Sequence, residues 1–442
     1  MPFPEDFIWG AATASYQIEG GGLDEGRGEC IWHHFSHTPG KVKNGDTGMV
    51  ACDHLHRYKD DVALMREIGL KGYRFSISWP RVIPAGTGEI NEQGLAFYDH
   101  LVDELLAQGI EPYATLYHWD LPQQLQEKGG WENPESVQWF ADYTDLMTRR
   151  LGDRLKGWIT LNEPWCISIL SNLIGEHAPG KKDPQAAYKV AHHLALAHGA
   201  AIRVIRQNCP GVPAGITLNL WPVYANSDSE QDLMAKQMYD SIFNRWFLDP
   251  VFKGTYPEDA VELLTPYLTG IDLDSIQAAK EPLDFIGINY YNRVVIAYDS
   301  ENPLGFKSIQ PEDSEYTAMN WEIYAPGLKD IIMRVYEDYA PKVIYVTENG
   351  AAYDDPEPAD GTVEDPLRAK YVADHLKACE DAIDAGAPLK GYFLWSLMDN
   401  FEWAHGYSKR FGMIHVNYET QERTLKRTAR MYQEMISKNG LV

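Results

Sequence analysis

The chain has 442 residues, of which 44% are hydrophobic and 12% aromatic, and its formal net charge is −25. This charge, without any run of lysine or arginine, argues against nucleic acid and anionic membranes as partners and favours a neutral ligand. The five cysteines are odd in number and lack Cys-x-x-Cys spacing, so we expect neither a disulfide framework nor a metal site. We also expect no cofactor.

No linker, charge block or low-complexity stretch divides the sequence, so we expect residues 1–442 to form one large domain. The first residues lack a basic segment followed by an apolar one, and no stretch approaches 18 apolar residues. We therefore expect a cytoplasmic protein without a membrane span. The sequence leaves the oligomeric state open, and a homo-oligomer is compatible with it.

Apolar or aromatic runs typical of buried strands alternate with helical patterns along the chain. The predicted strands cover about residues 7–17, 72–79, 110–118, 156–162, 212–221, 284–291, 342–347 and 389–397. The predicted helices cover about residues 54–68, 95–106, 137–151, 190–205, 231–247, 328–339, 367–383 and 425–436. Gly69, Gly109, Gly152 and Gly386 follow four of these helices and are predicted to end them.

Repeated strand-then-helix units without a linker predict an α/β fold, a single (β/α)8 TIM barrel with long βα loops. A doubly wound open sheet would give the same alternation. It would need a glycine-rich phosphate turn after the first strand, and Gly20-Gly21-Gly22 does not have that spacing.

In a barrel of this kind the active site lies where the strands end, so the residues at those positions are expected to converge. They are Gln17, Glu19, Arg74, His118, Trp119, Asn162, Glu163, Tyr290, Tyr291, Glu348, Asn349 and Trp395, with Glu402 and Trp403 just beyond. Carboxylates, amides and indoles suit a neutral ring with many hydroxyls and an apolar face. Two carboxylates flanking an anomeric carbon can hydrolyse a glycoside, and Glu163 and Glu348 are the candidates.

Several motifs occur in order on separate predicted strands. They are Ala14-Ser15-Tyr16-Gln17-Ile18-Glu19-Gly20, Tyr73-Arg74-Phe75-Ser76-Ile77-Ser78-Trp79-Pro80-Arg81, Thr160-Leu161-Asn162-Glu163-Pro164, Asn289-Tyr290-Tyr291, Thr347-Glu348-Asn349-Gly350 and Trp395-Ser396-Leu397-Met398-Asp399-Asn400-Phe401-Glu402-Trp403. The chain resembles glycoside hydrolase family 1, the β-glucosidases, nearly from end to end.

The resemblance implies that Glu348 is the nucleophile and Glu163 the acid and base of a retaining hydrolysis. Arg74 and Tyr291 would contact Glu348 and favour its ionised form. Asn162 would hold the 2-hydroxyl of the sugar. The remaining implied contacts to the glycone are Gln17, His118, Glu402 and Trp403, with Trp395 as the platform and Trp119 as a wall. Trp165 and Trp321 resemble positions that contact the aglycone.

The implied substrate is a small β-glucoside or short β-linked oligosaccharide such as cellobiose, with weaker activity on β-galactosides and β-fucosides. Two alternatives stay open. A 6-phospho-β-glycosidase would have serine in place of Glu402, although Lys409 is present and Phe411 stands where that branch tends to have tyrosine. A non-catalytic sugar-binding barrel would have lost one of the two glutamates, and both are present.

Two further residue groups are interpreted as structural. His33, His34 and His37 lack a matching set of ligands for a metal site. Cys166 lies close to Glu163 in the sequence, but no neighbouring cation marks it as an activated thiol, and it is interpreted as a packing residue.

Overall fold

The computed structural model describes residues 2–442 and contains a closed barrel of parallel strands. The barrel strands are β1 (Ile8–Ala12), β2 (Gly72–Ser76), β3 (Glu111–Tyr117), β4 (Gly157–Asn162), β5 (Ala214–Asn219), β7 (Phe285–Asn289), β10 (Ile344–Asn349) and β11 (Leu389–Trp395). Their order around the barrel is β1-β11-β10-β7-β5-β4-β3-β2, so β1 pairs with both β11 and β2 and closes the ring. The predicted (β/α)8 barrel is confirmed.

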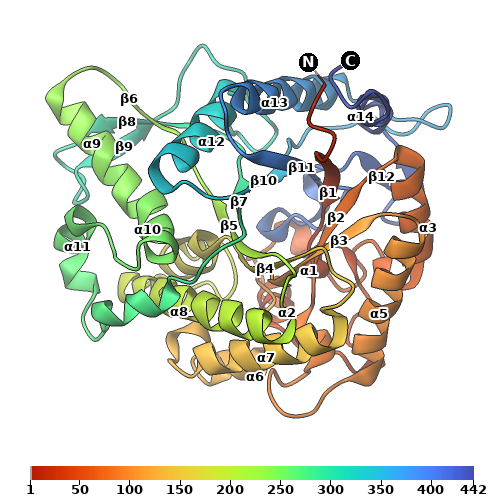
Figure 1. Ribbon diagram of the computed structural model, residues 1–442, viewed down its shortest axis with the longest axis horizontal. Helices are drawn as coiled ribbons and strands as arrows, with labels where there is room; N and C mark the ends of the chain where they lie inside the picture. The colour runs from red at the N-terminus through yellow and green to blue at the C-terminus, as the bar shows by residue number, and fades with distance from the viewer. Residues whose placement is uncertain (1) are drawn as a thin grey trace.

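Helices surround the barrel (Figure 1). The longer ones are α3 (His54–Ile68), α5 (Glu92–Ala107), α7 (Ser136–Leu151), α8 (Pro184–Asn208), α9 (Glu230–Asp240), α12 (Pro326–Tyr339), α13 (Pro366–Asp384) and α14 (Arg427–Lys438). The shorter ones are α1 (Ser15–Ile18), α2 (Ile31–His37), α4 (Trp79–Val82), α6 (Gln123–Glu127), α10 (Trp246–Phe252), α11 (Glu258–Leu264), η1 (Asp24–Gly26), η2 (Lys43–Gly45), η3 (Gly130–Glu132), η4 (Cys166–Ile174), η5 (Ser241–Arg245), η6 (Thr265–Tyr267), η7 (Leu273–Ala279) and η8 (Trp403–Ser408). None of the helices within residues 2–442 is long and apolar enough to cross a membrane.

The barrel interior is layered along its axis. Toward the start of the strands, the rings of Tyr113, Tyr345 and Phe393 meet at centroid distances of 5.2 to 6.2 Å. A Cβ on Gly10 would lie 2.4 Å from the Phe393 ring, so the glycine gives that ring its space. Aromatic packing thus fills the lower barrel and leaves the upper end of the strands for polar side chains.

Three of the four glycines predicted to end helices do so in the left-handed conformation: Gly69, Gly109 and Gly386 have φ of 88°, 73° and 98°. Gly152 differs, because it caps α7 with φ −59° and ψ −31°. A Cβ there would lie 2.0 Å from the Cys209 sulfur. Close packing, and not the turn, therefore requires this glycine.

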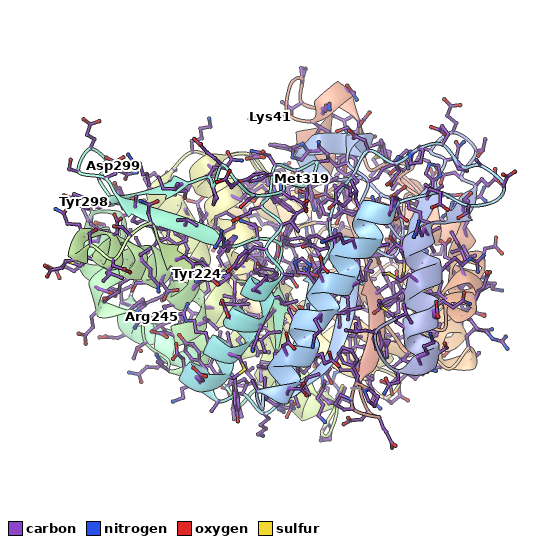
Figure 2. All side chains as sticks on the ribbon, turned by 90° about the horizontal axis from the view of Figure 1, so that it is seen from above. Lys41, Tyr224, Arg245, Tyr298, Asp299 and Met319 are labelled. Carbon is purple, nitrogen blue, oxygen red and sulfur yellow. The ribbon has the colours of Figure 1, made fainter. Side chains whose placement is uncertain are left out.

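Several elements were not predicted. The strands β6 (Val223–Ala225), β8 (Val294–Tyr298) and β9 (Phe306–Ile309) form a small sheet beside α9, and β12 (Ile414–Val416) pairs with β13 (Arg423–Leu425). The predicted helix 231–247 is broken by a π-helical turn at η5 before α10. Figure 2 shows Tyr298 and Asp299 at the outer end of the small sheet, well apart from Met319.

Candidate active site

Glu348 lies at the upper end of β10, where its carboxyl group has two strong donors. The guanidinium of Arg74 on β2 donates to Oε1 at 2.6 Å, and the hydroxyl of Tyr291 donates to Oε2 at 2.7 Å. The side chains of Arg74 and Glu348 are 1% and 4% exposed. A donor on each oxygen holds the carboxyl group in place and favours its ionised form.

Glu163 follows β4 at a sharp turn of the backbone. Its φ of 51° is uncommon for a residue with a side chain, and its N–H donates to the carbonyl of Thr217 at 3.0 Å. Its carboxyl group has weaker partners than Glu348 has: the amide of Asn289 donates to Oε1 at 2.7 Å, and the thiol of Cys166 donates to Oε2 at 3.2 Å. Among residues 2–442, no cation is a hydrogen-bond partner of this carboxyl group.

A network of amides joins the two glutamates. Asn162 Oδ1 accepts from Arg74 at 2.6 Å and from Asn289 at 3.1 Å. Asn289 on β7 is the Cα partner of Glu348 in the sheet, while its side chain reaches Glu163. Four strands of the barrel thereby position the two carboxyl groups against each other.

Burial and the negative charge of Glu348 raise the pKa of Glu163 to about 8, while the donors Asn289 and Cys166 lower it. Burial raises the pKa of Glu348 as well, whereas the Arg74 guanidinium and the Tyr291 hydroxyl lower it. The two groups titrate as a pair. Because Glu348 has the cation and the phenol, it is the carboxyl group that ionises first, and Glu163 keeps its proton near neutral pH.

A cleft opens over both glutamates. Its walls are His118, Trp119, Glu163, Trp165, Cys166, Leu170, Glu176, His177, Asn219, Leu220, Trp221, Asn289, Tyr291, Asn292, Met319, Trp321, Glu348, Trp395, Glu402, Trp403, His405 and Phe411. Of the residues predicted for the site, Gln17, Arg74 and Asn162 are not on this surface and lie behind it, in contact with residues that are. Glu19, Tyr290 and Asn349 were also expected to converge here, but they do not line the cleft: Glu19 pairs with Arg81, Tyr290 donates to the carbonyl of Tyr324, and Asn349 donates to the carbonyl of Tyr290. The other predicted residues line the cleft.

Glu402 lies at the closed side of the cleft and is 7% exposed. Gln17 Nε2 donates to it at 3.5 Å and to the carbonyl of Phe401 at 2.8 Å. Gln17 Oε1 is buried and has no partner within residues 2–442. Burial, together with the charges of Glu348 and Glu163, raises the pKa of Glu402 to about 8. An incoming hydroxyl group would pair with these oxygens and favour the ionised carboxylate.

His118 is neutral, and its tautomer follows from its neighbour. Because Asn162 Oδ1 accepts two hydrogen bonds, its Nδ2 must donate, and it lies 3.0 Å from His118 Nε2. The ring proton is therefore on Nδ1, which is buried without a partner in the described part of the chain. Burial and the charge of Arg74 hold the pKa of His118 well below its ordinary value.

Indole rings form the remaining walls. Trp403 contacts Trp119 at a centroid distance of 4.6 Å, and the His118 ring stacks on Trp395 at 5.9 Å. Nearer the opening, Trp321 packs on Tyr291 at 5.0 Å and Trp165 on Trp221 at 4.9 Å. Apolar ring faces with few polar atoms between them can hold the apolar face of a sugar or an aromatic group.

Lys409 does not line the cleft, because its ammonium group donates to the carbonyl of Ala318. Within residues 2–442, no group of three or more His, Cys, Asp or Glu side chains is arranged to hold a metal ion.

Asn289 and Asn219 were not predicted for the site, and Cys166 was interpreted as a packing residue, yet all three line the cleft. The two asparagines end β7 and β5, and their position at strand ends was the signal that could have identified them. For Cys166 the sequence holds no such signal, because its contact with Glu163 depends on the turn between them.

Comparisons with known proteins agree with this geometry. The model of glycosyl hydrolase family 1 matches residues 1–441. The chain is 47% identical over 441 residues to Beta-glucosidase A of Thermotoga maritima, covering 99% of this chain and 98% of that protein. It is 41% identical to a bifunctional beta-D-glucosidase/beta-D-fucosidase of Bifidobacterium breve, covering 99% and 98%. A solved structure of the Thermotoga maritima beta-glucosidase in complex with deoxynojirimycin has a TM-score of 0.97, 47% identity and full coverage of both chains.

Proposed function

The chain belongs to glycosyl hydrolase family 1 and is a retaining β-glucosidase, and we propose that Glu348 is its nucleophile and Glu163 its acid and base. The observation that supports this assignment is the difference between two neighbouring buried carboxyl groups. One is surrounded by a cation and a phenol, the other by an amide and a thiol. Such environments separate the roles of two identical side chains.

In the first step, the ionised Glu348 attacks the anomeric carbon and forms an ester with the sugar. The bond to the leaving oxygen breaks as Glu163 donates its proton to that oxygen. Tyr291 and Arg74 hold the attacking carboxylate in line during this step.

In the second step, the esterified Glu348 no longer carries its charge, so the pKa of Glu163 falls and the residue ionises. The carboxylate of Glu163 then takes a proton from water while the water oxygen attacks the anomeric carbon. The ester bond breaks, Glu348 is released as a carboxylate, and the sugar leaves with its original configuration.

The glycone would lie on Trp395, with Gln17, His118, Glu402 and Trp403 as partners of its hydroxyl groups and Trp119 beside it. The unpaired Gln17 Oε1 and His118 Nδ1 support this assignment, since a ligand hydroxyl can accept from one and donate to the other. Asn162 would hold the 2-hydroxyl, and Trp165 and Trp321 would contact the aglycone.

The substrate is then a small β-glucoside or a short β-linked oligosaccharide such as cellobiose, with β-galactosides and β-fucosides as poorer substrates. A relative named as both a glucosidase and a fucosidase supports the latter. We further propose that residues 1–442 act as one catalytic domain in the cytoplasm.

Retention is tested by following the first product with proton NMR. We expect a β-glucoside to release β-glucose first, with the α-anomer appearing only at the rate of mutarotation. The signal of the anomeric proton distinguishes the two forms within the first minutes of reaction. Initial release of the α-anomer would contradict the double-displacement mechanism.

Replacing Glu402 with Ser should lower kcat/KM for nitrophenyl β-glucoside by at least about a hundredfold, roughly 2.7 kcal/mol of transition-state stabilisation. The reason is that a buried carboxyl group accepting from sugar hydroxyls leaves those hydroxyls unpaired when it is removed. Activity on the 6-phospho-β-glucoside should fall much less or rise. A phosphate brings close to two negative charges at pH 7 into a cleft that is already lined by four carboxyl groups.

The measurement is kcat/KM for nitrophenyl β-glucoside, β-galactoside, β-fucoside and 6-phospho-β-glucoside with the native and variant enzymes. Comparable native rates on the phosphorylated and unphosphorylated glucosides would favour the 6-phospho-β-glycosidase instead.

A further inference from the structure

Cys166 stands at the start of the π-helix η4, in the wall of the cleft, and is 7% exposed. Its backbone N–H donates to the carbonyl of Glu163 at 2.9 Å, which closes the turn after β4. The turn therefore fixes the thiol beside the carboxyl group that precedes it by three residues.

The direction of the thiol hydrogen bond follows from a third residue. The amide of Asn219, at the end of β5, donates to the Cys166 sulfur at 3.8 Å. The sulfur is thus an acceptor on one side, and its S–H points to Glu163 Oε2 at 3.2 Å. Burial, reinforced by the charge of Glu163, raises the pKa of the thiol well above its ordinary value, so it keeps its proton.

Glu163 consequently has one neutral donor on each oxygen, Asn289 on Oε1 and Cys166 on Oε2. Donors of this kind favour the ionised form of a carboxyl group. In the first step of the reaction they oppose the raised pKa. In the second step they hold both oxygens of the ionised group in place for the attacking water.

We propose that Cys166 is a positioning residue for Glu163, whose thiol holds Oε2 in the orientation from which the carboxylate accepts a proton from water. This inference rests on the proposed role of Glu163 as acid and base. It assigns to Cys166 more than the packing role that the sequence suggested.

Other charged or titratable groups face Glu163 from the surrounding elements. Glu348 on β10 acts to raise its pKa, and Arg74 on β2 acts to lower it. The charge of Glu163 in turn raises the pKa of Glu402, which follows β11. Tyr291 and His118 also line the cleft, and Glu176 acts on the thiol. None of these groups is altered by a substitution at Cys166, so a change in the pH profile reports the thiol.

The test compares Cys166→Val, which removes the donor, with Cys166→Ser, which keeps one. On 2,4-dinitrophenyl β-glucoside the leaving group needs no proton, so the base-assisted second step limits kcat. We expect Cys166→Val to lower this kcat about fivefold, the effect of one weak hydrogen bond, with kcat/KM unchanged within about twofold. On phenyl β-glucoside the alkaline pKa of kcat/KM should rise by about 0.7 unit, the equivalent of the same fivefold change.

Cys166→Ser should retain the native kcat within about twofold and an alkaline pKa at or below the native one, because a hydroxyl is the better donor. Cys379→Val is the matched control, since Cys379 is fully buried in α13 away from the cleft. If Cys166→Val does not fold, Cys166→Ala removes the donor without a branched side chain.

A native kcat and pH profile in Cys166→Val, or equal losses in the valine and serine variants, would overturn the inference. Azide rescue of Glu163→Ala, measured in the same series, separates the outcomes. If azide rescues that variant but Cys166→Val behaves as native, only the role of the thiol is wrong.

Discussion

Replacing Glu348 with Gln is expected to lower kcat/KM on every β-glucoside by at least about 10⁵-fold, or roughly 6.8 kcal/mol of activation free energy. The amide has the shape of the carboxylate and can still contact Arg74 and Tyr291. It cannot attack the anomeric carbon to form the ester, so neither step proceeds. The measurement is steady-state turnover of 2,4-dinitrophenyl β-glucoside, the substrate with the best leaving group.

The fold of this variant is checked by thermal unfolding, and its cleft by binding of deoxynojirimycin, which is known to bind the related Thermotoga maritima enzyme. Both should persist. Azide is the informative reagent here. If azide restored turnover of Glu348→Gln and gave the β-glucosyl azide, the roles of Glu348 and Glu163 would be reversed.

Replacing Glu163 with Ala should have an effect that depends on the leaving group. On phenyl β-glucoside or cellobiose we expect kcat/KM to fall by about 10³-fold, because the leaving oxygen departs without a proton. On 2,4-dinitrophenyl β-glucoside, kcat/KM should stay within about tenfold of native, while kcat falls because water lacks its base. Added azide should raise that kcat, since the anion attacks the ester without proton transfer.

The product of the azide reaction should be the β-glucosyl azide, identified by NMR. Glu67→Ala provides the matched control, because Glu67 on α3 is an exposed glutamate that pairs with the exposed Arg430. Equal losses on the phenyl and dinitrophenyl substrates would show that Glu163 does not protonate the leaving group.

The barrel was predictable because the buried strands appear as continuous apolar runs, whereas the helices between them repeat apolar residues every three to four positions. The two patterns alternate along the chain. The strand β2, buried along its whole length, is an example. The small sheet of β6, β8 and β9 was not predictable. Its strands are three to five residues long and partly exposed, so they form neither a long apolar run nor a clear alternation of apolar and polar residues.

The site was predictable to the extent that it stands at strand ends. Glu163, Glu348 and Arg74 come from three separate strands, and the barrel closure brings them together. Asn289 and Cys166 depend instead on where a side chain reaches after a turn or across a register shift between β7 and β10. The position of Asn289 at the end of β7 could be read from the sequence, but its contact with Glu163, like that of Cys166, is a property of the folded backbone.

The backbone of the cleft also bears on how this protein can evolve. Glu163, Trp119 and Trp403 all have positive φ, of 51°, 79° and 45°, and each such residue raises the energy of the native state by about 1 kcal/mol or more. Three buried carboxyl groups that repel one another add to this cost. A lineage selected for folding alone would drift toward glycine at these turns and toward amides at these acids. Keeping the residues found here requires continued selection for turnover, and the rest of the barrel must supply the stability that its catalytic rim gives up.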